Sequence, residues 1–240
     1  MKGQGRPREK LAEGNDELKR TYRAKSRDMS DVALGIEENS MKIIESEIGI
    51  HGYTKAQWNI VRRVIHATAD FDFAKPDKNG IIFSTNAIEN AYAAFKQRRH
   101  IVVDVDMVLS GINKKSVAKI GTNLICNISN KDVFEISKNQ NKTRSTVAMR
   151  YSSKEIDGGI VVIGNAPTAL YEVIKMVNEN AARPSLVIGI PVGFVSASES
   201  KLELSKANVE FITNIGRKGG SPAASSIINA LMLMYINNLN

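Results

Sequence analysis

Three short segments of this sequence combine glycine or proline with polar residues in a way that is typical of anion binding. Each follows an apolar run and precedes a stretch with helical periodicity: 165–168 (NAPT), 191–194 (PVGF) and 216–222 (GRKGGSP). Where a strand passes into a helix, the first backbone N–H groups of the helix point at the ligand and favour negative charge. The candidate residues of such an anion pocket are Asn165, Gly193, Arg217 and Ser221.

His66 is the candidate for proton transfer. It belongs to a predicted helix that begins at Thr54, where Gln57 completes a capping box, and whose apolar stripe runs from Trp58 to Thr68. The side chain of His66 projects roughly 100–140° away from this stripe, so it is not expected in the core. Two interpretations stay open: an ordinary surface histidine, or a titratable group at the edge of a cleft.

Four more residues could take part in chemistry. Arg144 stands at the start of a predicted helix, where a cation opposes the helix dipole, so anchoring an anion explains it better. Asp104 and Asp106 end a predicted strand and could be general acid/base groups, but acids at such positions also form turns. Ser40 lies inside a helical segment, where the sequence by itself predicts only a solvated hydroxyl group.

The composition narrows the classes of function. The formal net charge is +8, and residues 1–30 carry +4 of it, with nine Lys/Arg against five Asp/Glu. The remaining charge is mixed with acids and shows no interleaving with aromatic residues, so nucleic-acid binding is not expected. The sequence contains no phosphate-binding loop, dinucleotide fingerprint, serine-hydrolase elbow or zinc-protease motif. It has no run of 18 apolar residues, so a membrane-spanning helix is not expected either.

Cysteine and histidine usage also bears on the chemistry. The single cysteine, Cys126, excludes a disulfide within the chain, which fits a reducing cytosol. His51, His66 and His100 lack metal-ligand spacing, so no metal site is predicted. What remains is an anion pocket with one histidine, which suits proton-assisted chemistry on a polyanionic small molecule.

The elements that must position these residues alternate between strands and helices. Apolar, β-branched runs predict strands at 80–84, 101–105, 124–128, 161–164, 185–190 and 211–215. Ser196 with Glu199, and Ser221 with Pro222, are expected to begin the last two helices. The final helix is apolar nearly all round, which predicts a place in the core or at an interface. In such α/β folds, ligands bind where strands pass into helices.

Six segments together resemble the precorrin-8 methylmutase (precorrin isomerase) family of corrin and cobalamin biosynthesis, including its cobalt-precorrin-8 form. The resemblance extends from about Ser40 to about Leu233, in one order. The matching segments are His66-Ala67-Thr68, 104–108 (DVDMV) with Gly111-Ile112, 142–145 (KTRS), 163–170 (IGNAPTAL), 189–195 (GIPVGFV) with 199–201 (ESK), and 216–221 (GRKGGS).

The resemblance implies a three-layer α/β/α sandwich with a mainly parallel, five-stranded, flavodoxin-like sheet. It also implies a homodimer. A single domain is expected over residues 31–240, after a basic extension, residues 1–30, that falls outside the resemblance, and the protein is expected in the cytoplasm. The expected reaction is a methyl migration in ring C of precorrin-8 or cobalt-precorrin-8, giving hydrogenobyrinate or cobyrinate. No cofactor is expected, since any cobalt belongs to the tetrapyrrole substrate. His66 would donate and accept the proton, and Ser40 and Arg144 would bind the substrate.

Two other classes of function stay open at this stage. A nucleotide- or anion-binding α/β regulatory module would share the fold and the glycine-rich turns, and nucleotides would raise its melting temperature. A basic nucleic-acid binder would lose affinity steeply with salt and would not need His66.

Overall fold

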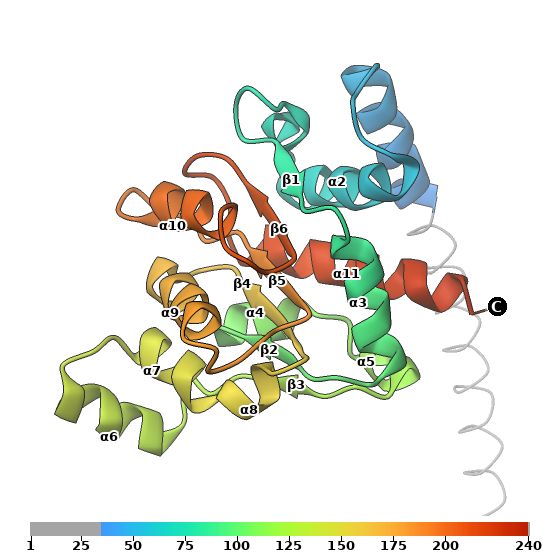
Figure 1. Ribbon diagram of the computed structural model, residues 1–240. Coiled ribbons are helices and arrows are strands. Elements are labelled where there is room, and N and C mark those ends of the chain that lie inside the picture. Colours follow the sequence, from blue (N-terminus) through green and yellow to red (C-terminus); the bar gives the residue numbers. More distant parts are fainter. Residues whose placement is uncertain (1–34, 240) are drawn as a thin grey trace, which may run out of the picture. The chain divides into compact units, whose positions relative to one another are not determined.

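The computed structural model describes residues 35–239, which fall into two compact units that meet in the sequence between Glu47 and Ile48 (Figure 1). In the first unit, the described residues are helical, in a stretch that covers 35–48. The second unit contains all the strands described here. The predicted basic extension, residues 1–30, and the predicted domain boundary at residue 31 lie outside the described residues and stay predictions.

The centre of the second unit is a six-stranded sheet in the order β1-β6-β5-β4-β2-β3. Its strands are β1 (Ile81–Phe83), β2 (Ile101–Val103), β3 (Leu124–Ile125), β4 (Ile160–Ile163), β5 (Leu186–Gly189) and β6 (Phe211–Asn214). β2 to β6 are parallel, and β1 pairs antiparallel with β6. Counted among themselves, the parallel strands have the order 2-1-3-4-5, which is the flavodoxin-like order.

The predicted fold class is therefore confirmed, but the predicted number of five strands is one short. Five is the number of the parallel strands, and β1 adds an antiparallel sixth strand at the edge. Antiparallel edge strands are common on otherwise parallel sheets. All residues of β4, β5 and β6 are buried, as expected for strands covered on both faces.

Helices cover both faces of the sheet (Figure 1). One layer holds α8 (Ser153–Ile156), α9 (Pro167–Asn178) and α10 (Ala197–Leu204), with α7 (Arg144–Tyr151) against α9 and α6 (Lys131–Gln140) against α7. The other holds α3 (Ala87–Lys96), α4 (Asp106–Gly111), α5 (Lys114–Ile120) and α11 (Ser221–Asn237). α2 (Lys55–Thr68) packs on α11 and leads into a short 3-10 helix, η1 (Phe71–Ala74).

The last helix, α11, is buried on most of its surface, as its apolar composition predicted. It packs against four helices as well as the sheet, which accounts for apolar residues on nearly every side. Near its end, the ring of Tyr235 contacts Tyr92 and Phe95 of α3, with centroids 5.6 and 5.4 Å apart. One apolar residue of α11, Leu233, stays partly outside the core and is 38% exposed.

Of three predicted helix starts, those of α2 and α10 are correct to the residue and that of α11 is one residue late, and only one of the three predicted caps is formed. Thr54 makes the full capping box with Gln57. Ser196 precedes α10 with a left-handed φ of 64° and makes no capping bond, because an N-cap side chain needs extended backbone to reach the helix amides. Ser221 is the first helical residue of α11, and Gly220 holds the cap position. Within residues 35–239, no helix is long and apolar enough to cross a membrane.

Candidate active site at the carboxyl edge of the sheet

Five loops meet at the carboxyl edge of the sheet, which is the edge where all five parallel strands end. Asp104 follows β2, Asn165 follows β4, and the loops that contain Gly193 and Arg217 follow β5 and β6. The strand order reverses between β2 and β4, and ligands of such sheets bind outside the carboxyl ends of the strands at this point.

Asp104 is fully buried at the reversal point, and its carboxylate holds the turn between β4 and α9. Its oxygens accept hydrogen bonds from the backbone N–H groups of Gly164 (3.1 Å), Asn165 (2.8 Å) and Ala166 (2.8 Å). Burial raises the pKa of Asp104, and these three hydrogen bonds offset part of that rise.

This arrangement corrects one prediction. The backbone amides of the loop after β4 were expected to bind substrate carboxylates, but those of Gly164, Asn165 and Ala166 are bonded to Asp104. Of the two interpretations of Asp104, the structural one, a residue that forms a turn, is confirmed. The side chain of Asn165 is exposed, so its amide group is the part of this residue that can meet a ligand.

Arg144 begins α7, as predicted, and lines a hollow of about 320 Å³. Ser129 and Lys131 line the same hollow, together with Phe134, which is 48% exposed. The hollow therefore presents two cations and one acid, Glu135, beside an exposed aromatic ring. Lys131 was not recognised in the sequence, because a lysine in the first turn of a polar helix resembles any solvated surface residue.

Hydrogen bonds connect this hollow to the reversal point. The hydroxyl group of Thr143, which caps α7, bonds to that of Thr168 in the first turn of α9 at 3.1 Å. On the other side, the hydroxyl group of Ser129 donates to the exposed carboxylate of Asp106 at 3.0 Å. Arg144 is thus held near the start of α9 by side chains that the sequence did not single out.

His66 lies in the last turn of α2, and its side chain is exposed, as its position off the apolar stripe predicted. The next residue, Ala67, lines a hollow of about 500 Å³ with Met107 and with Ser221 and Pro222 at the start of α11. His66 is therefore one position along α2 from a residue that lines a hollow built by α2, α4 and α11. The interpretation of a titratable group beside a cleft stays a prediction.

The loops after β5 and β6 pack against each other. The N–H group of Gly193 donates to the carbonyl oxygen of Arg217 at 3.2 Å, and the guanidinium of Arg217 lies 5.7 Å from the ring centre of Phe194. Gly219 was expected to let the backbone approach a ligand. A Cβ atom there would lie 2.5 Å from the carbonyl oxygen of Ile190, so this glycine is needed for the contact between the two loops.

Two lysines support the loop after β6, and neither was assigned a role from the sequence. Lys201, on α10, is 1% exposed, and its ammonium group donates to the carbonyl oxygen of Lys218 at 2.7 Å. The ammonium group of Lys218 lies 2.8 Å from carboxylate oxygens of both Asp70 and Asp72. Lys201 resembles a surface lysine in the sequence, because the apolar side of α10 is weakly marked.

Ser40 belongs to the first unit and is described by itself. Its hydroxyl group donates to the carbonyl oxygen of Ile36, one helical turn earlier, at 2.8 Å. This is the usual bond of a serine inside a helix. Its role in substrate binding stays a prediction.

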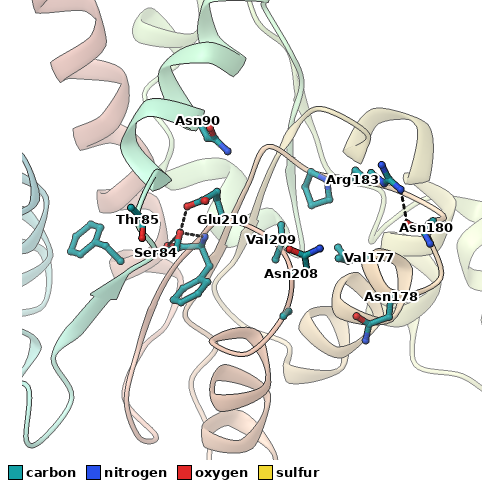
Figure 2. Close-up of a pocket in the computed structure, with 14 residues that line it drawn as sticks. Ser84, Thr85, Asn90, Val177, Asn178, Asn180, Arg183, Asn208, Val209 and Glu210 are labelled. Carbon is teal, nitrogen blue, oxygen red and sulfur yellow. Dashed lines mark hydrogen bonds between the residues drawn. The ribbon is translucent and has the colours of Figure 1, made fainter.

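A larger hollow, of about 870 Å³, lies at the opposite edge of the sheet (Figure 2). It is lined by the ends of α9 and β1 and by the segments that lead into β5 and β6. Figure 2 shows Arg183 bonded to Asn180, and Glu210 bonded to Ser84. No predicted site residue lines it, so its size does not make it the active site.

The carboxyl edge thus offers one exposed imidazole and cations from three different segments, Lys131, Arg144 and Arg217. An imidazole can transfer protons near neutral pH, and guanidinium groups bind carboxylates in a bidentate manner. The strand order and this edge define a flavodoxin-like α/β protein suited to an anionic small molecule.

Comparisons with known proteins identify the family. The family model of precorrin-8X methylmutase matches residues 35–234. A cobalt-precorrin-8 methylmutase from Priestia megaterium is 47% identical over 199 residues, which cover 83% of this chain and 87% of that protein. A precorrin-8X methylmutase from Pseudomonas aeruginosa is 33% identical and covers 82% of this chain and 93% of that protein.

A solved structure agrees with these sequences. A precorrin-8x methyl mutase from Thermus thermophilus superposes with a TM-score of 0.77 at 35% identity, covering 85% of this chain and 97% of that one. The chain belongs to the precorrin-8X methylmutase family, and it is an isomerase of cobalamin biosynthesis. Membership of this family decides against the regulatory module and the nucleic-acid binder.

The first prediction concerns the turn that Asp104 holds. In Asp104→Asn, the amide NH₂ group cannot accept, so at least one of the three backbone N–H groups loses its partner in a buried place. We expect the free energy of unfolding to fall by about 1–3 kcal/mol, measured by urea denaturation. Asp106→Asn, at an exposed position, is the control and should change it by less than about 0.5 kcal/mol. Equal stability of the two variants would contradict this account.

Proposed function

We propose that this protein catalyses the methyl migration in ring C of cobalt-precorrin-8, giving cobyrinate, with His66 as the proton donor and acceptor. The observation that carries the proposal is that His66 is exposed and directly precedes Ala67, which lines a hollow with Ser221 and Met107. All four residues lie in segments that resemble the family. The methyl group moves within the substrate, so the reaction needs no methyl donor and no redox cofactor.

The role of His66 follows from the chemistry of the shift. Protonation of the conjugated ring system lowers the barrier for a methyl group to move between adjacent carbons. The same imidazole then takes a proton back, so the enzyme returns to its starting state. Because the side chain is exposed in the free enzyme, it can exchange protons with solvent between turnovers. Placed proton transfer of this kind accelerates a reaction by about 10²–10⁴-fold.

The acetate and propionate groups of the substrate account for the cations at the carboxyl edge. Arg144 and Lys131 share one hollow, and Arg217 lies on the loop after β6. We assign carboxylate binding to these cations rather than to the backbone amides of the loop between β4 and α9, which are bonded to Asp104. Gly193, Asn165 and Ser221 line the same edge, and Ser40 is assigned to the substrate through the family resemblance.

Cobalt is proposed as part of the substrate on the strength of the relatives. The Priestia megaterium protein, named for the cobalt-containing substrate, is 47% identical, and another so named, from Methanocaldococcus jannaschii, is 41% identical. The Pseudomonas aeruginosa protein, named for precorrin-8X, is 33% identical.

A homodimer in the cytoplasm is proposed as the working form. Phe194 and Val195, in the loop after β5, are 85% and 82% exposed, and apolar side chains as exposed as these favour a partner surface. The single, half-buried Cys126 suits a reducing compartment.

The second prediction tests His66. His66→Ala should lower kcat by about 10²–10⁴-fold and leave substrate affinity within a few fold, because an exposed side chain leaves no cavity. Turnover and binding are both followed by the visible absorbance of the macrocycle. His100→Asn, which changes a histidine at the other end of β2, should keep wild-type turnover. Full activity of His66→Ala would refute the assignment of His66.

The third prediction tests Arg144. Arg144→Lys keeps the charge but loses the planar fork, so the dissociation constant of the substrate should rise about tenfold. Arg183→Lys makes the same change in the hollow at the opposite edge and should leave the constant unchanged. If both variants bind as tightly as the wild type, Arg144 does not contact a carboxylate.

The fourth prediction concerns the metal in the substrate. Purified wild-type protein should turn over cobalt-precorrin-8 with a higher kcat/KM than metal-free precorrin-8. The two substrates are compared under anaerobic conditions at one pH. A preference for the metal-free compound would assign this protein to the metal-free reaction, while His66→Ala would still report on the catalytic group.

A further inference from the structure

Lys201 is a lysine in the interior of the protein. Its side chain is 1% exposed, and its ammonium group has two acceptors, the carbonyl oxygen of Lys218 at 2.7 Å and Oδ1 of Asn214 at 3.1 Å. Within residues 35–239 it forms no ion pair. Burial lowers the pKa of Lys201 to about 7.

Such a residue costs stability rather than providing it. A buried cation without a carboxylate partner loses hydration that two neutral acceptors do not fully replace. A neutral amine has two N–H groups, which match the two acceptors, so the same contacts persist when Lys201 is uncharged. An apolar side chain of similar length would fill the space at lower cost. The lysine therefore has a role in placing its acceptors.

The two acceptors belong to the last residue of β6, Asn214, and to Lys218 in the loop that follows it. The carbonyl oxygen of Lys218 accepts from Lys201 and also from Nδ2 of Asn214 at 2.9 Å, and the same Nδ2 donates to the carbonyl oxygen of Ile215. Three side-chain hydrogen bonds thus fix two backbone carbonyl groups of one short loop. The loop cannot shift at Lys218 without breaking bonds in the interior.

The side chain of Lys218 connects this loop to the helix of His66. Its ammonium group lies 2.8 Å from carboxylate oxygens of Asp70 and Asp72, which follow directly on α2. These contacts raise the pKa of Lys218 and lower the pKa of Asp72. Asp70 is four residues after His66 in the sequence. The end of α2 is therefore tied to a loop whose backbone is held from inside by Lys201.

We propose that Lys201 is a positioning residue of the methyl migration: by fixing the backbone at Lys218, it holds the end of α2, and with it His66, against the substrate-binding loop. This rests on the proposed function of His66. Lys201 acts through Lys218 and does not touch the substrate. The exposed ion pairs of Lys218 contribute little stability by themselves, so their value lies in the geometry that they maintain.

The test separates position from stability. In Lys201→Met the chain length is kept and the donor is lost. We expect kcat to fall about 10–100-fold, because a displacement of about 1 Å of a catalytic group has this effect. The free energy of unfolding, measured by urea denaturation at pH 7, should stay equal or rise, because an apolar side chain suits the buried place better. Lys206→Met, an exposed lysine just after α10, is the control and should leave both quantities unchanged.

A second set of variants tests the ion pairs of Lys218 with Asp70 and Asp72. The double change Asp70→Asn and Asp72→Asn removes both carboxylates at the protein surface and should lower kcat to the same extent. Adding Lys201→Met to it should lower kcat no further, since both changes break one connection. These surface variants keep the proposal testable if Lys201→Met does not fold.

The outcomes are distinct. If His66→Ala abolishes turnover but Lys201→Met or the aspartate variant keeps wild-type kcat, the positioning role is refuted and the proposed function stands. If the fold losses of kcat in Lys201→Met and in the double aspartate variant multiply in the triple variant, the positioning role is also refuted, because the residues then act independently. If His66→Ala keeps full activity, the proposed function itself fails.

Discussion

A buried carboxylate at the reversal point of the sheet determines the geometry of the carboxyl edge. Asp104 cannot be placed in the interior without hydrogen-bond donors, and the turn after β4 supplies three of them. The same turn starts α9, whose Thr168 bonds the cap of α7 and so places Arg144. It also contains Gly164, where a Cβ atom would lie 2.9 Å from Cα of Ser221, so the close approach of α11 depends on it. Both flanks of the site therefore rest on one carboxylate.

Much of this arrangement could be predicted from the sequence, because it depends on residues that are close together in the chain. The apolar runs predicted every strand of the described sheet, since strands buried on both faces need such runs. The position of His66 relative to the apolar stripe of α2 predicted its exposure. The helix start at Arg144 was predicted from the cap at Thr143. In these cases neighbours in the sequence decide the outcome.

What the sequence did not reveal depends on partners far apart in the chain. Asp104 and Ala166 are separated by 62 positions, and no local pattern indicates that one satisfies the other. Gly219 looks suited to a ligand, but its neighbour is the carbonyl oxygen of Ile190 in another loop. Lys201 looks like a solvated lysine, because its burial is decided by the loop after β6 that packs over it. Long-range contacts decide which polar groups a ligand can reach.

Which polar groups are used within the protein and which stay available decides how the site can recognise its ligand. The backbone amides of the loop before α9 are bonded to Asp104. The loops after β5 and β6 contact each other through the amide of Gly193 and through Gly219. The groups that stay directed at solvent are long side chains, Arg144, Lys131 and Arg217. Long cationic side chains adjust to several carboxylates on flexible arms, whereas fixed amides would demand one geometry. A macrocycle with acetate and propionate groups needs recognition by adjustable side chains. Under the proposed function, proton transfer by His66 needs a fixed geometry instead, and the ion pair between Lys218 and Asp70 is the rigid contact proposed to provide it.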